Sequence, residues 1–315
     1  MLARSLILIV TTALAVAATP ITPSYNPQHI IRRGYQPSYK ALDGDDAKPY
    51  SLDRVDLMHS EDKHNSASST PTHDATTGYG YLFTHFTSTD EDVYFHLSDG
   101  DSPLNFTELN HGKQIVSSNV GAGAARDPFI VVNPISNQAY LLGNNQSFIK
   151  GNISSYDQAF NQGYDGIVVF DGKSDDFTKW AKPRLLTVAP KDNLHVFAPE
   201  AVWIPEQKRF LIHWSGATKA DPVQRIYGAY TTDFKTVSEP FLYFTEGTTG
   251  VGDLTLFKLN EKAGQRNNSY VRFYRSDVAD SSVRGQISEN GIFGSWRDIA
   301  PLNVSVSVCC DAFPS

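Results

Sequence analysis

The chain has 315 residues, of which 40% are hydrophobic and 19% are charged, and this composition indicates a folded globular domain rather than a disordered chain. The formal net charge is −7 and no long basic run occurs, which excludes nucleic acid and anionic membrane surfaces as partners. Aromatic residues make up 12% of the chain. Tyr and Phe favour strands, and aromatic rings also stack on sugar rings, so the composition is typical of a strand-rich domain.

The N-terminus has the features of a secretory signal peptide. Met1 to Arg4 is a short basic start, Leu6 to Val16 is an uncharged apolar run, and Ala17 and Ala18 supply small residues for cleavage. No later segment reaches the apolar length of a membrane helix. We therefore predict that residues 1–18 are a signal peptide, and that the protein is secreted to the extracellular space and has no membrane partner.

Two features fit an exported protein. Residues 19–77 are rich in Pro, Ser, Asp, His and Lys with few periodic apolar positions, which predicts a polar linker or a propeptide. Five Asn-x-Ser/Thr sequons follow the signal and predict a glycoprotein with at least two of them occupied. They begin at Asn105, Asn145, Asn152, Asn267 and Asn303.

The two cysteines are adjacent, at Cys309 and Cys310. Neighbouring cysteines pair only in a strained ring, so we expect no structural disulfide framework. Two thiols without a nearby histidine do not make a tetrahedral zinc site either. The domain must therefore be stabilised by a large hydrophobic core.

From Gly78 onward the sequence consists of short β-branched and aromatic runs that are separated by Asn, Asp, Gly and Pro turns. No amphipathic helix longer than two turns is expected. We predict an all-β domain over residues 78–315. The expected strands cover residues 79–86, 92–98, 127–132, 139–142, 166–170, 210–214, 225–230, 254–257, 270–274 and 284–287.

A weak internal repeat indicates the kind of β-domain. Four times, a strand ends in a polar turn that is followed by an aromatic residue and a short outer strand; the aromatic residues are Phe106, Phe177, Phe234 and Phe293. Their separations of 57 to 71 residues suit one four-stranded propeller blade each. About four blades are present, which predicts either a four-bladed ring or a five-bladed ring that lacks its last blade.

Three carboxylates stand at the starts of predicted strands. Asp127 precedes Pro128 at one strand, Glu200 follows Ala-Pro at another, and Asp253 begins a third. For Asp127 alone, a turn-capping role is the simpler interpretation. Three carboxylates at equivalent blade positions would converge on the propeller axis, however. Such convergence suits glycosidic bond cleavage, which needs an acid, a base and a group that tunes the pKa of the acid.

The ordered motifs of this chain resemble those of glycoside hydrolase family 43, the five-bladed propeller glycosidases, and in style its arabinofuranosidase-like members. These motifs are Gly80 to Phe86, Val93 to Ser98, Arg126-Asp-Pro-Phe129, Ala198-Pro-Glu-Ala201 and Gly252-Asp-Leu-Thr-Leu256. The resemblance implies that Asp127 is the general base and that Asp253 modulates a pKa. Phe197 stands where the family has Trp, and Gly252 stands where it has Ile.

The resemblance also implies a general acid, a Glu in a Glu-Gly-Pro-like motif, and this motif is missing. Glu246, Glu261 and Glu289 all lack its context. We therefore predict that the last blade is incomplete, by truncation or by a gene-model error, and that this form is poorly soluble and inactive. The β-fructosidases share the ring but need an Asn-Asp-Pro nucleophile and a Glu-Cys acid, which are absent.

The predicted function is a secreted hydrolase that cleaves arabinofuranosyl or xylosyl linkages of plant-type polysaccharides with inversion. A non-catalytic glycan-binding propeller is the alternative. Asp127 and Asp253 are the predicted catalytic residues, and the predicted substrate-binding residues are Arg126, Phe197, Glu200, His213 and Trp214. Core packing is an alternative for His213 and Trp214. The expected partner is a polysaccharide or oligosaccharide. No cofactor or metal is predicted, although a structural Ca²⁺ occurs in some relatives.

Overall fold

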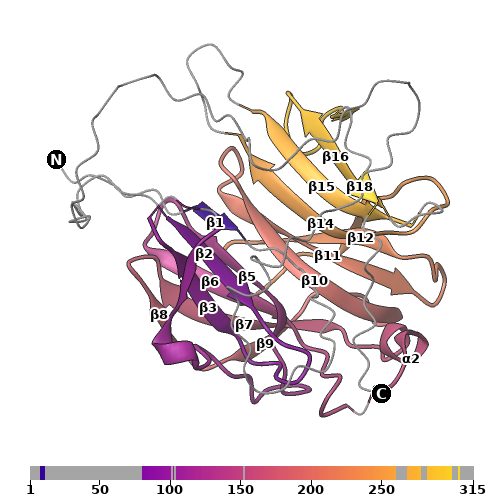
Figure 1. The fold of residues 1–315 in the computed structure, drawn as a ribbon. Coiled ribbons are helices and arrows are strands. Elements are labelled where there is room, and N and C mark those ends of the chain that lie inside the picture. The colour runs from indigo at the N-terminus through magenta and orange to yellow at the C-terminus, as the bar shows by residue number, and fades with distance from the viewer. Residues whose placement is uncertain are drawn as a thin grey trace, which may run out of the picture.

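The computed structural model describes residues 80–259 apart from 101, 103 and 152, together with residues 268–277 and 282–299 and the backbone of 8–10 and 304–305. The predicted cleavage site, the whole of the predicted linker and both cysteines lie outside the described residues. The described chain is nearly all β-structure, arranged as four sheets that follow one another in chain order (Figure 1). No helix in this part of the chain is long and apolar enough to cross a membrane.

The first two sheets are built from short, mostly antiparallel strands. In order, the first sheet contains β1 (Leu8–Val10), β2 (Tyr81–His85), β3 (Tyr94–Ser98) and β4 (Phe106–Glu108). β1 pairs in parallel with β2 and falls within the predicted signal segment. A 3₁₀ turn, η1 (Asn110–Gly112), follows β4. The second sheet contains β5 (Arg126–Val132), β6 (Gln138–Asn144), β7 (Gly166–Lys173) and β8 (Asp176–Trp180), and β9 (Arg184–Thr187) also pairs with β7. The short helix α2 (Tyr156–Phe160) lies between β6 and β7, and the Ser155 hydroxyl caps it.

The third and fourth sheets repeat the plan with longer strands. The third contains β10 (Asn193–Ile204), β11 (Arg209–Thr218), β12 (Arg225–Thr231) and β13 (Phe241–Phe244). The fourth contains β14 (Val251–Lys258), β15 (Tyr270–Ser276), β16 (Ser282–Ser288) and β17 (Arg297–Asp298), and β18 (Val304–Ser305) also pairs with β16. This is a four-blade β-propeller arrangement, which confirms the predicted all-β propeller class.

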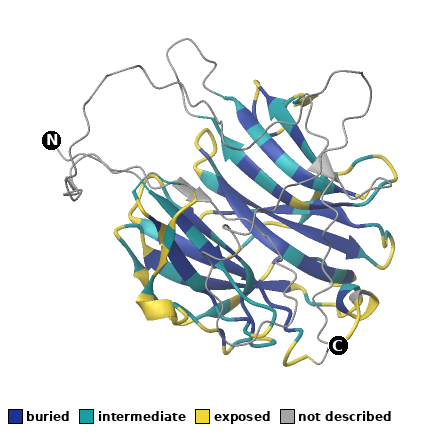
Figure 2. Cartoon of the chain, viewed as in Figure 1, coloured by how far each residue is buried: buried dark blue, intermediate teal, exposed yellow. Residues whose placement is uncertain are grey.

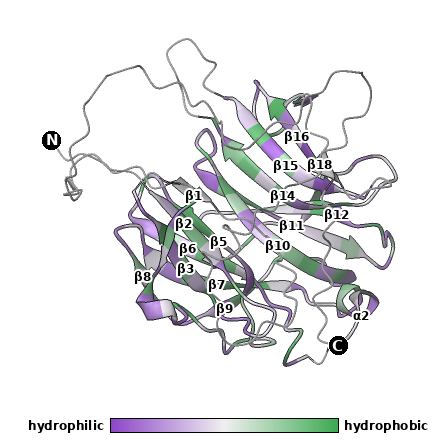
Figure 3. Cartoon of the chain, viewed as in Figure 1, coloured by the Kyte–Doolittle hydropathy of each residue, from purple (hydrophilic) through white to green (hydrophobic). Residues whose placement is uncertain are grey.

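Hydrophobic clusters join each sheet to the next. Successive residues of a strand face opposite sides of a sheet, so Leu211 enters the cluster shared with the fourth sheet while Ile212 enters the cluster shared with the second. A further cluster, which includes Phe95 and Leu141, joins the first sheet to the second. Buried residues run along β10, β11 and β12 (Figure 2), and stretches of hydrophobic residues follow the same strands (Figure 3). The middle sheets are therefore covered on both faces.

The aromatic residues of the sequence repeat mark the same place in every blade. Phe106 opens β4 and Phe177 lies in β8, while Phe234 and Phe293 stand in the connections before β13 and β17. Each therefore follows the third strand of its sheet, either within the fourth strand or in the connection that leads to it. Their burial differs: Phe234 is fully buried in the cluster between the second and third sheets, whereas Phe293 is 52% exposed.

Two of the five predicted sequons have described asparagines, and these differ in exposure. Asn105 is exposed. Asn145 is buried, and its Oδ1 accepts a hydrogen bond from the Ala122 N–H at 3.0 Å. In the folded domain, therefore, Asn145 is no glycan acceptor. The sequons at Asn152, Asn267 and Asn303 begin outside the described residues, and glycosylation stays a prediction.

Candidate active site

The first strands of three successive sheets contain the same irregularity. β10 lies against β5 on one side and against β14 on the other. In each of the three strands the pairing register breaks near the strand start, between Arg126 and Phe129 in β5, between Phe197 and Glu200 in β10, and between Gly252 and Thr255 in β14. A bulge of this kind bends the strand and redirects a side chain, and it is common next to active sites.

A left-handed residue occupies the equivalent position of each bulge: Asp127 with φ 50°, Ala198 with φ 44° and Asp253 with φ 52°. Asp127 and Asp253 are therefore structurally equivalent, as the sequence suggested. Glu200 is not their equivalent, because it stands two residues after Ala198 and corresponds to Thr255. The expectation of three carboxylates at three equivalent positions is wrong in this respect, since the third blade has alanine at the bulge.

Asp127 is held by groups from two sheets. Asn144 Nδ2 of the neighbouring strand donates to Asp127 Oδ2 at 3.2 Å, and the Ala198 N–H of β10 also donates to this carboxylate. Burial raises the pKa of Asp127, the Arg126 guanidinium and these hydrogen bonds oppose the rise, and the charge of Asp253 adds to it. A carboxylate with a raised pKa is a stronger base, so Asp127 is suited to take a proton from water.

Asp253 is the more exposed of the two aspartates, with 44% of its side chain accessible. Its backbone N–H donates to Ser215 Oγ at 2.8 Å, which fixes the bulge to the third sheet. Its Oδ2 accepts a hydrogen bond from Arg275 Nε at 3.0 Å. Asp253 raises the pKa values of both Asp127 and Glu200, so the three carboxyl groups form one electrostatic site.

Glu200 lies deeper than the two aspartates and is only 8% exposed. Its Oε2 accepts a hydrogen bond from Thr255 Oγ1 at 2.8 Å. Burial raises its pKa well above the ordinary value; the Thr255 hydroxyl opposes the rise and Asp253 adds to it. Glu200 is therefore the carboxyl group of this site that most favours the protonated form.

Arg126 and Phe197, two of the predicted substrate-binding residues, are largely committed to protein contacts. The Arg126 guanidinium lies between the rings of Phe86 and Phe148, at 4.6 and 4.0 Å from their centroids, and pairs with Glu91 at 3.0 Å. This arrangement anchors the residue beside Asp127. Phe197 stacks on the His195 ring at 4.5 Å and remains partly exposed.

His213 and Trp214, two further predicted substrate-binding residues, are each only 1% exposed. Trp214 lies in the cluster between the second and third sheets and stacks on Tyr227. His213 faces the other way, and burial lowers its pKa to about 3. Within the described structure, neither ring nitrogen of His213 has a hydrogen-bond partner. Both residues pack between blades, and neither side chain is accessible to a sugar in this structure.

Asn144, Gln224 and Arg275 contribute polar groups to this site that the sequence did not indicate. None stands in a local motif. Asn144 and Arg275 each bond an aspartate on the strand that is paired with their own, and Gln224 bonds Arg275 from the segment just before β12. No group of three or more His, Cys, Asp or Glu side chains suited to a metal ion occurs among the described residues.

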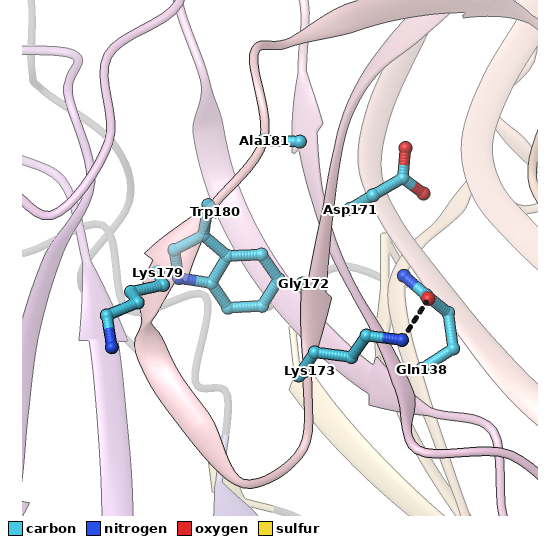
Figure 4. Close-up of a pocket in the computed structure, with 7 residues that line it drawn as sticks. All are labelled: Gln138, Asp171, Gly172, Lys173, Lys179, Trp180 and Ala181. Carbon is cyan, nitrogen blue, oxygen red and sulfur yellow. Dashed lines mark hydrogen bonds between the residues drawn. The ribbon is translucent and has the colours of Figure 1, made fainter.

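A shallow hollow on the second sheet is separate from this site (Figure 4). Its lining includes Lys173, Lys179 and Trp180, and Lys173 Nζ bonds Gln138 Oε1 at 3.4 Å. Trp180 packs edge-on against Phe95 in the first sheet and lies close over Gly172. The hollow contains none of the three carboxylates, so we assign Trp180 to blade packing.

The model of a family related to glycosyl hydrolase family 43, described as a "probable glycosyl hydrolase domain", matches residues 77–305. The chain belongs to this family. The match begins where the predicted polar linker ends and covers all four sheets apart from β1. The carboxylate site therefore lies entirely within the glycosyl hydrolase domain. No curated protein matches the chain.

Several solved glycosidase structures are similar to the domain at low identity. The catalytic domain of a Coprinopsis cinerea family 62 α-L-arabinofuranosidase is 12% identical with a TM-score of 0.47, and the match covers 71% of this chain and 65% of that one. An endo-arabinase from Bacteroides thetaiotaomicron is 16% identical, with a TM-score of 0.45 and coverage of 69% and 75%. A family 43 β-1,3-galactosidase is 11% identical, with a TM-score of 0.44; the match covers 69% of this chain but only 42% of that one.

Proposed function

We propose that the protein is a secreted glycoside hydrolase that cleaves arabinofuranosyl or xylosyl linkages of plant-type polysaccharides with inversion. The observation that carries this proposal is the pair of aspartates, Asp127 and Asp253, at equivalent bulges of two blades that flank a third. Membership of the family supports the reaction class. The resemblance of the motifs around Asp127 and Asp253 to those of arabinofuranosidase-like members of family 43 supports the proposed sugar class.

In the proposed reaction Asp127 takes a proton from a water molecule as its oxygen attacks the anomeric carbon. Inversion also needs a carboxylic acid that gives its proton to the leaving oxygen as the glycosidic bond breaks. Glu200, the carboxyl group of this site that most favours its protonated form, is the proposed donor. The raised pKa of Asp127 favours proton acceptance, while Asn144 and the Ala198 N–H fix the direction of the carboxylate. The negative charge of Asp253 raises the pKa of Glu200, so Glu200 keeps its proton to a higher pH.

The test is hydrolysis of nitrophenyl α-L-arabinofuranoside, nitrophenyl β-D-xyloside and arabinan oligosaccharides by the full chain. Turnover by the full chain would overturn the sequence-based prediction that this form is inactive. Asp127→Asn keeps the size and the left-handed preference of the residue but removes the base. It should lower kcat/KM by roughly 10²–10⁴-fold. Asp175→Asn is the matched control, because Asp175 is exposed on the second sheet away from the site; its activity should equal that of the wild type.

Product stereochemistry and binding decide between the two candidate functions. Proton NMR of the first-formed sugar should show the inverted anomer. Equal turnover by Asp127→Asn and the wild type would remove Asp127 from the role of base. Oligosaccharide binding by calorimetry without any hydrolysis would replace the proposal with the glycan-binding alternative.

A further inference from the structure

Arg275 is the only arginine of the described residues that bonds one of the two bulge aspartates. It stands on β15 directly opposite Gly252. Its Nε donates to Asp253 Oδ2 at 3.0 Å, its Nη2 donates to Gln224 Oε1 at 2.6 Å, and its Nη1 pairs with Asp277. All three guanidinium nitrogens are therefore bonded, and the group is held in one orientation beside Asp253.

Gly252 makes this arrangement possible. A Cβ atom at position 252 would lie 2.6 Å from Arg275 Nη2 and 3.0 Å from Gln224 Oε1. Real Cβ atoms essentially never approach that closely, so any side chain here would displace the guanidinium. The glycine that departs from the expected isoleucine thus has a physical reason in this chain: it leaves space for Arg275.

The far end of the network fixes the orientation of Gln224. His195 Nδ1 lies 3.1 Å from the Phe160 carbonyl oxygen of α2, and its Nε2 lies 3.4 Å from Gln224 Nε2. Burial lowers the pKa of His195 to about 4, and the Arg275 cation contributes, so this histidine is neutral at neutral pH. With its proton on Nδ1, Nε2 accepts from the Gln224 amide. That contact turns Gln224 Oε1 toward Arg275.

We propose that Arg275 is a positioning residue that holds the Asp253 carboxylate in place opposite Asp127, and that Gly252 is the residue that admits it. This inference rests on the proposed hydrolase function for its kinetic consequence. Its electrostatic consequence does not depend on turnover. The Arg275 cation offsets the charge of Asp253, and this charge acts on both Asp127 and Glu200.

The kinetic test compares Arg275→Met, Gly252→Ala and the double variant. Gly252→Ala is informative because the added methyl group meets mobile side-chain ends rather than backbone, so the blade should stay folded while the guanidinium moves away. Each single variant should lower kcat roughly 10–100-fold, a loss typical of residues that orient a reactive group. The double variant should lose no more than Arg275→Met alone, since both changes remove the same contact.

Two further variants separate positioning from general structure. Arg184→Met is the matched control, because Arg184 pairs with Asp171 at 3.0 Å and its side chain is as exposed as that of Arg275, 27% in both. It should leave kcat unchanged. Arg275→Lys keeps the positive charge and should recover part of the activity that Arg275→Met loses, which a purely structural role would not predict.

A second measurement needs no turnover. Carbon-13 NMR titration of the carboxyl groups should show that the pKa of Asp127 rises further in Arg275→Met and in Gly252→Ala, because Asp253 is then less neutralised. Arg184→Met should leave the titration unchanged. An Asp127 titration that is the same in Arg275→Met as in the wild type, or additive kinetic losses in the double variant, would overturn the inference. A wild type that hydrolyses nothing would overturn the proposed function. The NMR titration would still decide whether Arg275 positions Asp253.

Discussion

The charge of Asp253 raises the pKa values of both Asp127 and Glu200, but the two carboxyl groups have different stabilising partners. Asp127 has a nearby guanidinium, a side-chain amide and a backbone N–H that oppose the effect of burial. Among the described residues, Glu200 has only the hydroxyl of Thr255 to oppose it. A buried carboxylate with so little compensation is costly, so Glu200 favours its neutral form. The site thus pairs a carboxylate stabilised for proton acceptance with a carboxyl group that retains its proton.

Glu200→Gln should therefore stabilise the protein at alkaline pH. The pKa of Glu200 is raised in the folded state, so above about pH 4.5 the unfolded chain loses this proton first, and stability falls as pH rises. Glutamine cannot ionise, and its oxygen can still accept from Thr255. Urea unfolding should show a gain of roughly 1–3 kcal/mol at pH 8 and little change at pH 4.

Glu239→Gln is the control for that measurement, because Glu239 is exposed. It should leave the unfolding free energy unchanged at both pH values. If Glu200→Gln destabilises the protein at pH 8, then the carboxylate is the stabilised form and the charge assignment at this site is wrong.

The candidate site could be predicted from the sequence only as far as its local motifs extend. Asp127, Glu200 and Asp253 were found because proline and glycine mark the strand starts. That Ala198, and not Glu200, is the third equivalent residue depends on strand register, which local spacing does not reveal. The contact between Arg275 and Asp253 likewise depends on the pairing of β14 with β15.

At the scale of single elements, β10 differs from what its sequence predicts because it contains a proline. In the third sheet the sequence predicted only the strands at residues 210–214 and 225–230, which are the middle strands β11 and β12, and no strand through Pro199. Proline usually interrupts a ladder. β10 nevertheless runs from Asn193 to Ile204 through that residue. Its bulge falls at Ala198 and Pro199, where the register break removes the need for a ladder N–H. Pro128 occupies the corresponding place in β5.

The repeat offers a direct comparison of equivalent positions in two blades. Phe234→Ala should lower the free energy of unfolding by about 3–5 kcal/mol, because the ring is fully buried against Tyr140 and Phe210. Phe293→Ala should cost about 1 kcal/mol, because that ring is half exposed and makes only peripheral aromatic contacts. Denaturant unfolding of the two variants measures both values. Equal costs would mean that the burial of the two blade corners does not differ in solution.

At the scale of the whole molecule, the blades pack through apolar clusters that also enclose histidines. Both faces of the middle sheets are covered, so a strand with strict alternation has no solvent-facing side. For this reason His213 and Trp214, adjacent in β11, are both buried although they face opposite ways. The predicted propeller class followed from turn spacing and the aromatic repeat, whereas the coverage of each sheet face depends on neighbouring blades that the sequence does not place.

The buried histidines should make the protein sensitive to acid. Burial lowers the pKa of His195 to about 4 and that of His213 to about 3, from an ordinary value of 6.5. Below pH 6.5 the unfolded chain therefore binds protons that the folded chain excludes, and stability falls as pH falls. Each histidine contributes a slope of up to about 1.4 kcal/mol per pH unit.

His213→Leu should reduce that slope by the share of one histidine between pH 6 and pH 4, and it breaks no hydrogen bond that the described structure shows. Urea unfolding across this range measures the slope. His111→Asn is the control, because His111 is exposed and asparagine tolerates its left-handed backbone. An unchanged slope in His213→Leu would show that His213 is protonated in the folded protein.

The left-handed backbone at the three bulges limits which residues can stand there over evolutionary time. Asparagine, aspartate and glycine adopt φ values near 50° at little cost, whereas longer or branched side chains are strained. The substitutions that the fold tolerates best at Asp127 and Asp253 are thus to asparagine and glycine, which abolish the charge and spare the blade. A duplicated copy of this gene released from selection for hydrolysis would therefore lose its chemistry well before its architecture, and sequence drift at these two positions would report that loss.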